Sequence, residues 1–345
     1  MDRKRLPLNR NGANTRDDIP RPAATRFPLQ PSALEAVLLV LCIALAWRAP
    51  GFLTRDNLLN VLRSVSMQGI IAFGMTMVII AGEIDLSVGS AVAFSGCLAA
   101  WIVGWASGQP LRLPPAAGVA AGITAALFVG TVVGCITGWL RVRYRVPTFI
   151  STLAWLTVLK GAAELITNGF PLTPFPDWYN FIGGGYLVGI PFPAIVFMAV
   201  FLGTHILMQK TAFGRALYAV GGNFEAARLS GILVHRTKIA VMAIVGCLAA
   251  LSGVMQASQI MSGSATTAQG WELDVISAVI IGGASLMGGA GTARGTLVGV
   301  IFLGVLLNGM TLLNISEYWQ HVVRGGLILT AVLVNLAPSR RSRSG

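Results

Sequence analysis

The sequence predicts an all-α protein, a polytopic membrane bundle of about ten transmembrane helices. Three observations lead to this fold class. Apolar residues make up 54% of the 345-residue chain and charged residues only 11%, whereas ordinary soluble domains carry about 25% charged residues. The low charge density continues from about residue 30 to residue 338, although a soluble core rarely grows past ~250–300 residues without splitting. Long uncharged stretches recur throughout. These features argue against a soluble enzyme, a disordered chain and a disulfide-stapled secreted module.

The uncharged stretches define the expected helices, because a helix that crosses a bilayer needs about 20 mostly apolar residues. One stretch contains two charged residues, Lys160 and Glu164. These residues are four apart, so they share a helix face and can pair. The ten expected spans are 36–47, 64–82, 86–111, 113–140, 146–165, 178–209, 239–271, 275–293, 295–316 and 325–339.

The first span, 36–47, is the weakest of the ten. It needs Glu35 at one edge and Arg48 at the other, with the long arginine side chain reaching toward the interface. A signal peptide is the alternative, since Ala44-Leu45-Ala46 is similar to a cleavage site. The basic region before it is longer than 30 residues, which is too long for a signal peptide. We therefore expect an uncleaved helix.

The net charge of +12 is distributed as in a membrane protein, which argues against nucleic-acid binding. Lys and Arg concentrate in cytoplasmic segments of membrane proteins. Basic residues crowd the tails at 1–32 and 338–345, which flank a transmembrane domain at 33–337, and the loop at 209–238, whereas the loop at 168–190 has no Lys or Arg. We therefore expect both termini and the 209–238 loop in the cytoplasm. Three basic residues do not fit this charge pattern, because the expected topology places them outside: Arg48, Arg55 and Arg63.

Four carboxylates stand at breaks between apolar helices, in two similar tripeptides, Glu83-Ile84-Asp85 and Glu272-Leu273-Asp274. The expected topology puts the first near the inner face and the second near the outer face. An inverted repeat, common in transporters, gives this placement, and chance similarity is the alternative.

These carboxylates have two interpretations. Broken helices at membrane depth survive where protein or a water-filled cavity satisfies the backbone, which favours a polar substrate path. The alternative is capping of helix ends, with Ser87 capping the next helix and Asp85 accepting backbone N–H groups. The residues expected to line a substrate path are Glu83, Asp85, Ser87, Glu272 and Asp274.

A glycine-rich run at 282–291 permits close helix packing or a sharp turn. It is no phosphate loop, because the chain contains no Gly-Lys dipeptide and hence no Walker A motif. If ATP drives this protein, a separate subunit binds the nucleotide.

The basic loop contains a short predicted helix. Gly221-Gly222-Asn223 indicates a turn, after which Asn223 can cap a helix that continues through Leu229 and ends at Gly231. Such an amphipathic helix suits docking into the groove of a partner. The alternative is a helix that lies on the membrane surface.

Four segments together resemble permease subunits of ATP-binding-cassette importers, and most closely those of the ribose/xylose type. They are 74–90 with Gly82-Glu83-Ile84-Asp85-Leu86-Ser87, 146–153 with Val146-Pro147-Thr148, 214–232 with Glu225-Ala226-Ala227, and 272–289 with Glu272-Leu273-Asp274. Family members commonly have Gly where this chain has Glu83. A related group that imports branched-chain amino acids tends to carry Asn at the position of Asp85, so a sugar is the preferred cargo.

The resemblance implies a transport subunit that performs no covalent chemistry and holds no cofactor or metal, with ATP and Mg bound by partner ATPase subunits. It also implies a second permease copy or paralogue and an extracytoplasmic sugar-binding protein in a bacterial inner membrane. Its docking motif implies the ATPase-coupling residues Arg215, Asn223, Glu225, Ala226, Ala227, Arg228 and Gly231.

Alternating access is the expected mechanism, driven by movement of the short inner helix. An ion-coupled secondary transporter is the rival, with Glu83, Asp85, Glu272 and Asp274 as proton sites. An intramembrane enzyme is a weaker rival, because no His-Glu-x-x-His motif or Ser/His pair supports it.

Overall fold

The computed structural model describes residues 31–108 and 112–336. The basic tails expected at 1–32 and 338–345 therefore lie almost entirely outside the described residues. Helices dominate the described chain, and its named strands form one small antiparallel pair. In chain order its elements are α1 (Pro31–Arg48), α2 (Arg55–Ile80), α3 (Val88–Ser107), α4 (Pro115–Tyr144), α5 (Thr148–Thr167), η1 (Asp177–Tyr179), α6 (Asn180–Gly184), β1 (Tyr186–Leu187), β2 (Ile190–Pro191), α7 (Phe192–Lys210), α8 (Ala212–Gly222), α9 (Phe224–Leu229), α10 (Val234–Ile260), α11 (Trp271–Ile281), α12 (Ala293–Leu312) and α13 (Glu317–Leu336).

Seven helices of the described chain are long and apolar enough to cross a membrane: α2, α3, α4, α5, α7, α10 and α12. Each overlaps an expected span, which confirms the all-α membrane bundle, although α2 begins nine residues before the span expected at 64–82 and α7 begins fourteen residues into the span expected at 178–209. The helices α1, with 18 residues, and α13, with 20, fall outside this set of seven.

The expected span at 275–293 is wrong as a single crossing. The helix α11 there has only 11 residues, about 16 Å at ~1.5 Å per residue, against a hydrocarbon core of ~30 Å. Four glycines after it have positive φ angles, which turn the chain toward α12: Gly283, Gly288, Gly289 and Gly291. The glycine-rich run also permits close packing, because a side chain at Gly282 would collide with the backbone of Gly295. Both expected roles of the run are confirmed.

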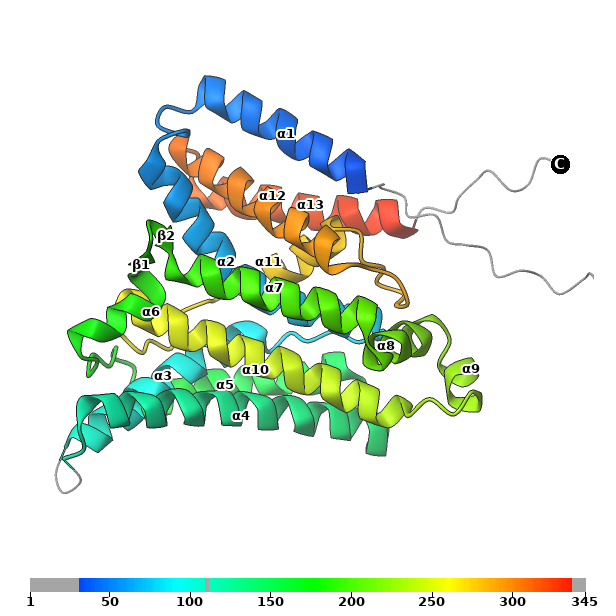
Figure 1. The fold of residues 1–345 in the computed structure, drawn as a ribbon, viewed down its shortest axis with the longest axis horizontal. Helices are drawn as coiled ribbons and strands as arrows, with labels where there is room; N and C mark the ends of the chain where they lie inside the picture. Colours follow the sequence, from blue (N-terminus) through cyan, green and yellow to red (C-terminus); the bar gives the residue numbers. More distant parts are fainter. Residues whose placement is uncertain (1–30, 109–111, 337–345) are drawn as a thin grey trace, which may run out of the picture.

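Helix α2 is the most completely buried of the seven and occupies the centre of the bundle (Figure 1). It packs against α7, α10, α11 and α12, while α10 packs in turn against α3 and α4. In Figure 1, α1, α12 and α13 lie on one side of α2, and α3, α4 and α5 lie on the other. The core is therefore built from the apolar faces of helices that are far apart in sequence.

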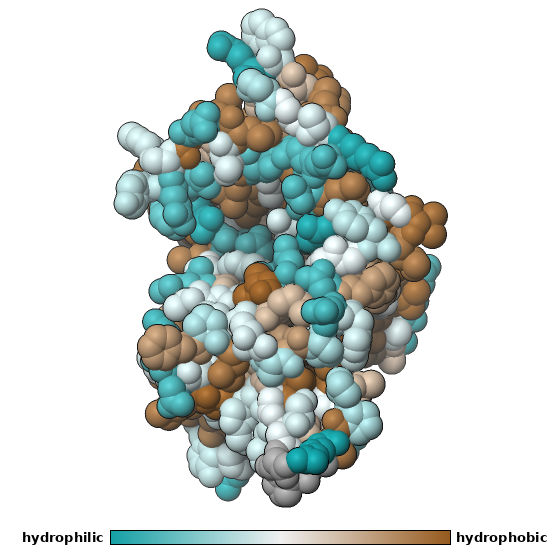
Figure 2. All heavy atoms as spheres, turned by 90° about the vertical axis from the view of Figure 1, so that its left-hand side faces the viewer, coloured by the Kyte–Doolittle hydropathy of each residue, from teal (hydrophilic) through white to brown (hydrophobic). Residues whose placement is uncertain are grey.

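The bundle has two distinct ends. The elements α6, β1 and β2 lie at one end, and α8 and α9 lie at the opposite end (Figure 1). The loop without Lys or Arg and the basic loop are thus at opposite ends, as the charge pattern predicts. Figure 2 shows the first of these ends, where hydrophilic side chains gather across the face.

Arg63 lies at the first end of the bundle. It is one of the three basic residues that the expected topology places outside, against the usual charge pattern. Its guanidinium donates to the Gly184 carbonyl at 3.3 Å and to the Tyr186 hydroxyl at 2.6 Å. It also lies 5.1 Å from the centroid of the Tyr186 ring, a cation–π distance. These contacts hold the guanidinium at this end of the bundle, while its buried Nε has no hydrogen-bond partner among the described residues.

Candidate functional site

Two helix starts meet inside the bundle. A side chain on Gly89, in the first turn of α3, would collide with the Glu272 carboxylate in the first turn of α11, and its Cβ would lie 2.8 Å from the Ala268 carbonyl. Only glycine allows this approach without displacement of its neighbours. The chain reaches these positions through two non-helical segments, 81–87 and 261–270.

The meeting point lies deep in the bundle. Helix α3 touches α10 near Gly253, because a side chain there would collide with the Val92 carbonyl. Gly253 is 15 residues along α10 from Lys238 at the α8–α9 end, roughly 22 Å at ~1.5 Å per residue. Gly89 lies about one turn nearer to that end. The two helix starts therefore lie roughly 17 Å from Lys238 along the bundle, a distance close to half the ~30 Å thickness of a bilayer core.

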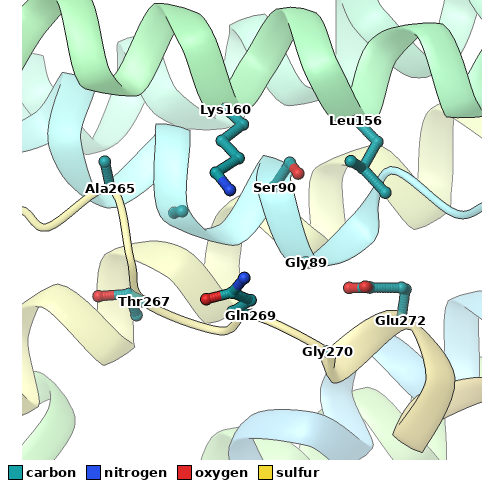
Figure 3. Close-up of a pocket in the computed structure, with 10 residues that line it drawn as sticks. Gly89, Ser90, Leu156, Lys160, Ala265, Thr267, Gln269, Gly270 and Glu272 are labelled. Carbon is teal, nitrogen blue, oxygen red and sulfur yellow. The ribbon is translucent and has the colours of Figure 1, made fainter.

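A cavity of about 110 Å³ opens beside these helix starts. Figure 3 shows Lys160 pointing from α5 toward the 265–270 segment, which carries Thr267 and Gln269, while Glu272 and Ser90 line other sides. The wall thus combines an ammonium, a carboxylate, an amide and hydroxyls. Such groups can form reversible hydrogen bonds with a polar solute.

Lys160 is one of the polar cavity residues that the list of expected site residues missed, together with Ser90, Thr267 and Gln269. It is exposed on α5, as is Glu164. The ion pairs found among the described residues do not include one between these two, although their spacing permits it. The available sequence signal was a charge inside an apolar span. A charged side chain inside a membrane raises the free energy of insertion unless it faces a cavity or a partner.

The structure does not bring the five expected path residues together. Glu272 lines the cavity. Asp85 is buried and accepts from the Ser87 amide at 2.8 Å and the Ser87 hydroxyl at 2.6 Å. Asp85 therefore accepts a backbone N–H as expected. Ser87 occupies the N-cap position of α3 but makes no side-chain cap, so that expectation is wrong: its hydroxyl is used by Asp85.

The remaining two carboxylates make ion pairs. Asp274 lies 2.8 Å from Arg324 Nε of α13 and accepts from Gln68 of α2 at 3.3 Å. Glu83 lies at the α8–α9 end, where Arg141 Nε donates to it at 2.7 Å and Lys238 Nζ also contacts it. The placement of Glu83 near one face agrees with the expected topology, whereas Glu272 lies deeper than expected.

The helix predicted in the basic loop is present as α9. Asn223 Oδ1 accepts from the Ala226 amide at 3.0 Å and so caps it, and Gly231 follows its end with φ of 78°. Of the expected coupling residues, all but one are exposed: Arg215, Asn223, Glu225, Ala226, Arg228 and Gly231. Glu225 pairs with Arg228 on this surface at 2.9 Å.

Ala227 is the buried exception. It packs with Val220 of α8 and Val234 of α10, so it attaches α9 to the bundle and offers no contact surface. The expected turn at Gly221-Gly222-Asn223 is correct only at Asn223, because Gly221 and Gly222 still belong to α8. Local signals could not reveal this, since Gly221 is required by a distant contact.

The end of α8 presses against two other segments. A side chain at Gly221 would collide with the Ile80 carbonyl at the end of α2, and the Gly289 amide donates to that carbonyl at 2.8 Å. The Tyr218 hydroxyl donates to the Gly291 carbonyl at 2.8 Å. Burial raises the pKa of this hydroxyl, so it stays protonated as a donor. The exposed α8–α9 surface is thereby joined to the glycine-rich segment that follows α11.

A bundle of membrane-spanning helices with a polar cavity inside it and an exposed helical surface at one end has the architecture expected of a membrane transport protein. The chain belongs to the family described as "Branched-chain amino acid transport system / permease component", which matches residues 57–332. It is therefore a permease component, a transport subunit of a multi-pass membrane protein family.

Curated relatives cover most of the chain. The ribose import permease protein RbsC of Bacillus subtilis is 44% identical over 300 residues, which span 86% of this chain and 90% of the relative. The L-arabinose ABC transporter permease protein AraH of Azospirillum brasilense is 39% identical over 302 residues, 88% of this chain and 86% of the relative. The xylose transport system permease protein XylH of Escherichia coli is 33% identical over 376 residues, 91% and 93% of the two chains. No solved structure matches significantly.

Proposed function

We propose that this chain is the membrane-spanning permease subunit of an ATP-driven importer, which carries a monosaccharide or a similar polyol-like solute into the cytoplasm by alternating access. The relatives named for ribose, arabinose and xylose support a sugar over a branched-chain amino acid. The cavity adds chemical support, since Ser90, Thr267, Gln269, Lys160 and Glu272 offer donors and acceptors to hydroxyl groups.

The observation that carries the proposal is the position of the α8–α9 surface. This exposed surface contacts the end of α2 and the glycine-rich segment behind α11. A partner that moves α8 and α9 can therefore act on a helix whose first turn lines the cavity. In the proposed assembly, ATPase subunits dock here on the cytoplasmic side and hold ATP and Mg, and this chain performs no covalent chemistry.

The other proposed partners are a second permease copy or paralogue and an extracytoplasmic sugar-binding protein. Four residues form an exposed stripe along α5, here called the α5 stripe: Leu153, Thr157, Lys160 and Glu164. A charged side chain at mid-bilayer costs roughly 2.5–3.5 kcal/mol on insertion scales. This cost favours a second protein chain or a water-filled path, rather than lipid, beside the stripe.

The test is uptake of radiolabelled D-ribose, D-xylose and L-arabinose by proteoliposomes that contain the permease, with and without its ATPase and binding protein. We expect ATP-dependent uptake of one of these sugars only with the complete set. Gly231→Trp should lower uptake but also cost some stability, because nothing lies near Gly231 but its φ of 78° strains any side chain. The bulky change at the exposed Glu225, Glu225→Trp, should lower uptake and leave thermal stability nearly unchanged. Gly161→Ala in α5, which also faces open space, is the matched control.

Two results would contradict the proposal. Uptake driven by a proton gradient without any ATPase would support the ion-coupled alternative. Normal ATP-dependent uptake by Gly231→Trp, together with an equivalent bulky change at Glu225, would show that the docking surface lies elsewhere.

A further inference from the structure

A buried charge cluster joins four parts of the chain at the α8–α9 end. Glu83, in the segment between α2 and α3, accepts from Arg141 of α4 at 2.7 Å and from the Thr148 hydroxyl of α5 at 2.8 Å. Lys238 of α10 donates to the same carboxylate. The Ile84 amide donates to Thr148 at 3.3 Å, so the segment is fixed by its backbone as well.

The cluster holds together because its central groups are out of water. Glu83 is 5% exposed and Lys238 is 8% exposed. A buried charge that loses its partner keeps the full cost of desolvation. Glu83 and Lys238 are therefore expected to move as a unit, so that displacement of α10 at this point displaces the 81–87 segment.

On its outer side the cluster contacts the proposed docking helix. The Lys238 ammonium lies 5.7 Å from the centroid of the Phe224 ring, within the range of a cation–π interaction. Phe224 is the first residue of α9 and is 42% exposed. Apart from the packing of Ala227, this is a direct contact between α9 and a buried group.

On its inner side the cluster leads to the cavity. From Glu83 the chain runs without helix to Val88, where α3 begins. Asp85 holds the middle of this short segment through Ser87. The next residues, Gly89 and Ser90, line the cavity. A shift of Glu83 is thus passed on to the helix start beside Glu272.

We propose that Glu83, Lys238 and Phe224 form a mechanical link, in which Glu83 and Lys238 are positioning residues that couple the position of α9 to the start of α3. This link deepens the proposed function, since it gives the route from the docking helix to one wall of the cavity. It is separate from the contact of α8 with the glycine-rich segment, which leads to α11 at the opposite wall.

The first experiment tests the link in the purified full chain, without any partner or sugar. Phe224 and Glu83 both contact Lys238, so the melting-temperature shifts of Phe224→Leu and Glu83→Gln should not add in the double variant. Phe224→Trp keeps an aromatic face and should resemble the wild type. As the control pair, Phe224→Leu combined with Asn308→Ala should be additive, because Asn308 pairs with Asn57 elsewhere. Additive shifts for Phe224 and Glu83 would overturn the link.

The second experiment tests coupling in proteoliposomes with the ATPase and binding protein, and it reports sugar molecules imported per ATP hydrolysed. We expect this ratio to fall several-fold in Glu83→Gln and Lys238→Met and to stay near the wild-type value in Lys238→Arg, which keeps the charge. The affinity for the ATPase should not change, since Glu83 and Lys238 are buried. A merely structural role would reduce the amount of folded protein but leave the ratio unchanged.

The outcomes separate the two proposals. If the wild type shows no ATP-dependent uptake, the proposed function fails, and the melting-temperature cycle still decides whether the link exists. If the wild type imports sugar and the charge-removing variants keep the normal ratio, the link plays no part in coupling while the proposed function stands.

Discussion

Glu272 and Asp274 show how residues two apart acquire different roles. Both stand in the first turn of α11, but residues at i and i+2 of a helix do not share a face. Glu272 is partly exposed and lines the cavity. Asp274 is 5% exposed and is held by Arg324 and Gln68. The first is therefore available to a solute, whereas the second fastens α11 to α13 and α2.

This difference predicts opposite phenotypes for two conservative changes. Asp274→Asn should lower the free energy of unfolding by about 3 kcal/mol, the size expected when a buried pair loses one charge. Glu272→Gln should leave stability nearly unchanged and reduce the rate of sugar uptake. Thermal unfolding in detergent and proteoliposome uptake measure the two effects. The assignment is wrong if Glu272→Gln destabilises the protein as much as Asp274→Asn.

Among the elements, α4 and α10 show that glycine sets the distance between helices. Side chains at Gly130 or Gly246 would each collide with the backbone of the other helix, and one at Gly134 would collide with the Met242 carbonyl. Small residues at a crossing let two helix backbones approach closely. The two long helices therefore pack through their backbones over several turns.

Gly134→Ala should consequently destabilise the bundle by about 1–3 kcal/mol, the usual cost of overpacking. The measurement is thermal unfolding of the purified chain. Gly161→Ala in α5 is the matched control, since it meets no atoms of the chain, and it should be neutral or slightly stabilising. Equal stability of Gly134→Ala and the control would show that α4 and α10 separate easily.

Elements were predictable where their signals are local. The cap at Asn223 and the stop at Gly231 are one turn from the residues that they affect, so α9 could be placed closely. The apolar run at 275–293 concealed a short helix, because apolar composition does not report where glycines turn the chain. The partners of Glu83 were out of reach, since Arg141 and Lys238 are 58 and 155 residues away and only the packing of α4 and α10 brings them together.

For the whole molecule, the sequence predicted the membrane class and the opposite positions of two loops, but of the residues that line the cavity it named only Glu272. The charge pattern separates the 168–190 loop from the basic 209–238 loop, and the structure places them at opposite ends (Figure 1). The cavity depends on where α3 and α11 begin in space, which no periodicity encodes. Its visible signs in the sequence were Glu272, a carboxylate at a helix break, and Lys160, a charge inside an apolar span.

The α5 stripe leads to a prediction about assembly. If a second copy lies beside this stripe, Thr157→Cys should form an intermolecular disulfide in a chain whose four native cysteines have been replaced by alanine. The observable is a dimer band on non-reducing gels of oxidised membranes. Val188→Cys, a fully exposed position in the β1–β2 turn, is the control for random collision. Cross-linking that is equally strong at both positions, or absent at Thr157, would place the partner elsewhere.

The contact of Gly221 with Ile80 and Gly289 has one more consequence. Where side chains separate two segments, rotamer changes can absorb a small displacement before anything beyond them responds. Here main chain rests on main chain, and no rotatable group lies between. A displacement of α8 therefore cannot be absorbed by side-chain rotation at this contact. Even a sub-ångström movement of α8, imposed by a docked partner, either moves the end of α2 and the glycine-rich segment or is resisted by them.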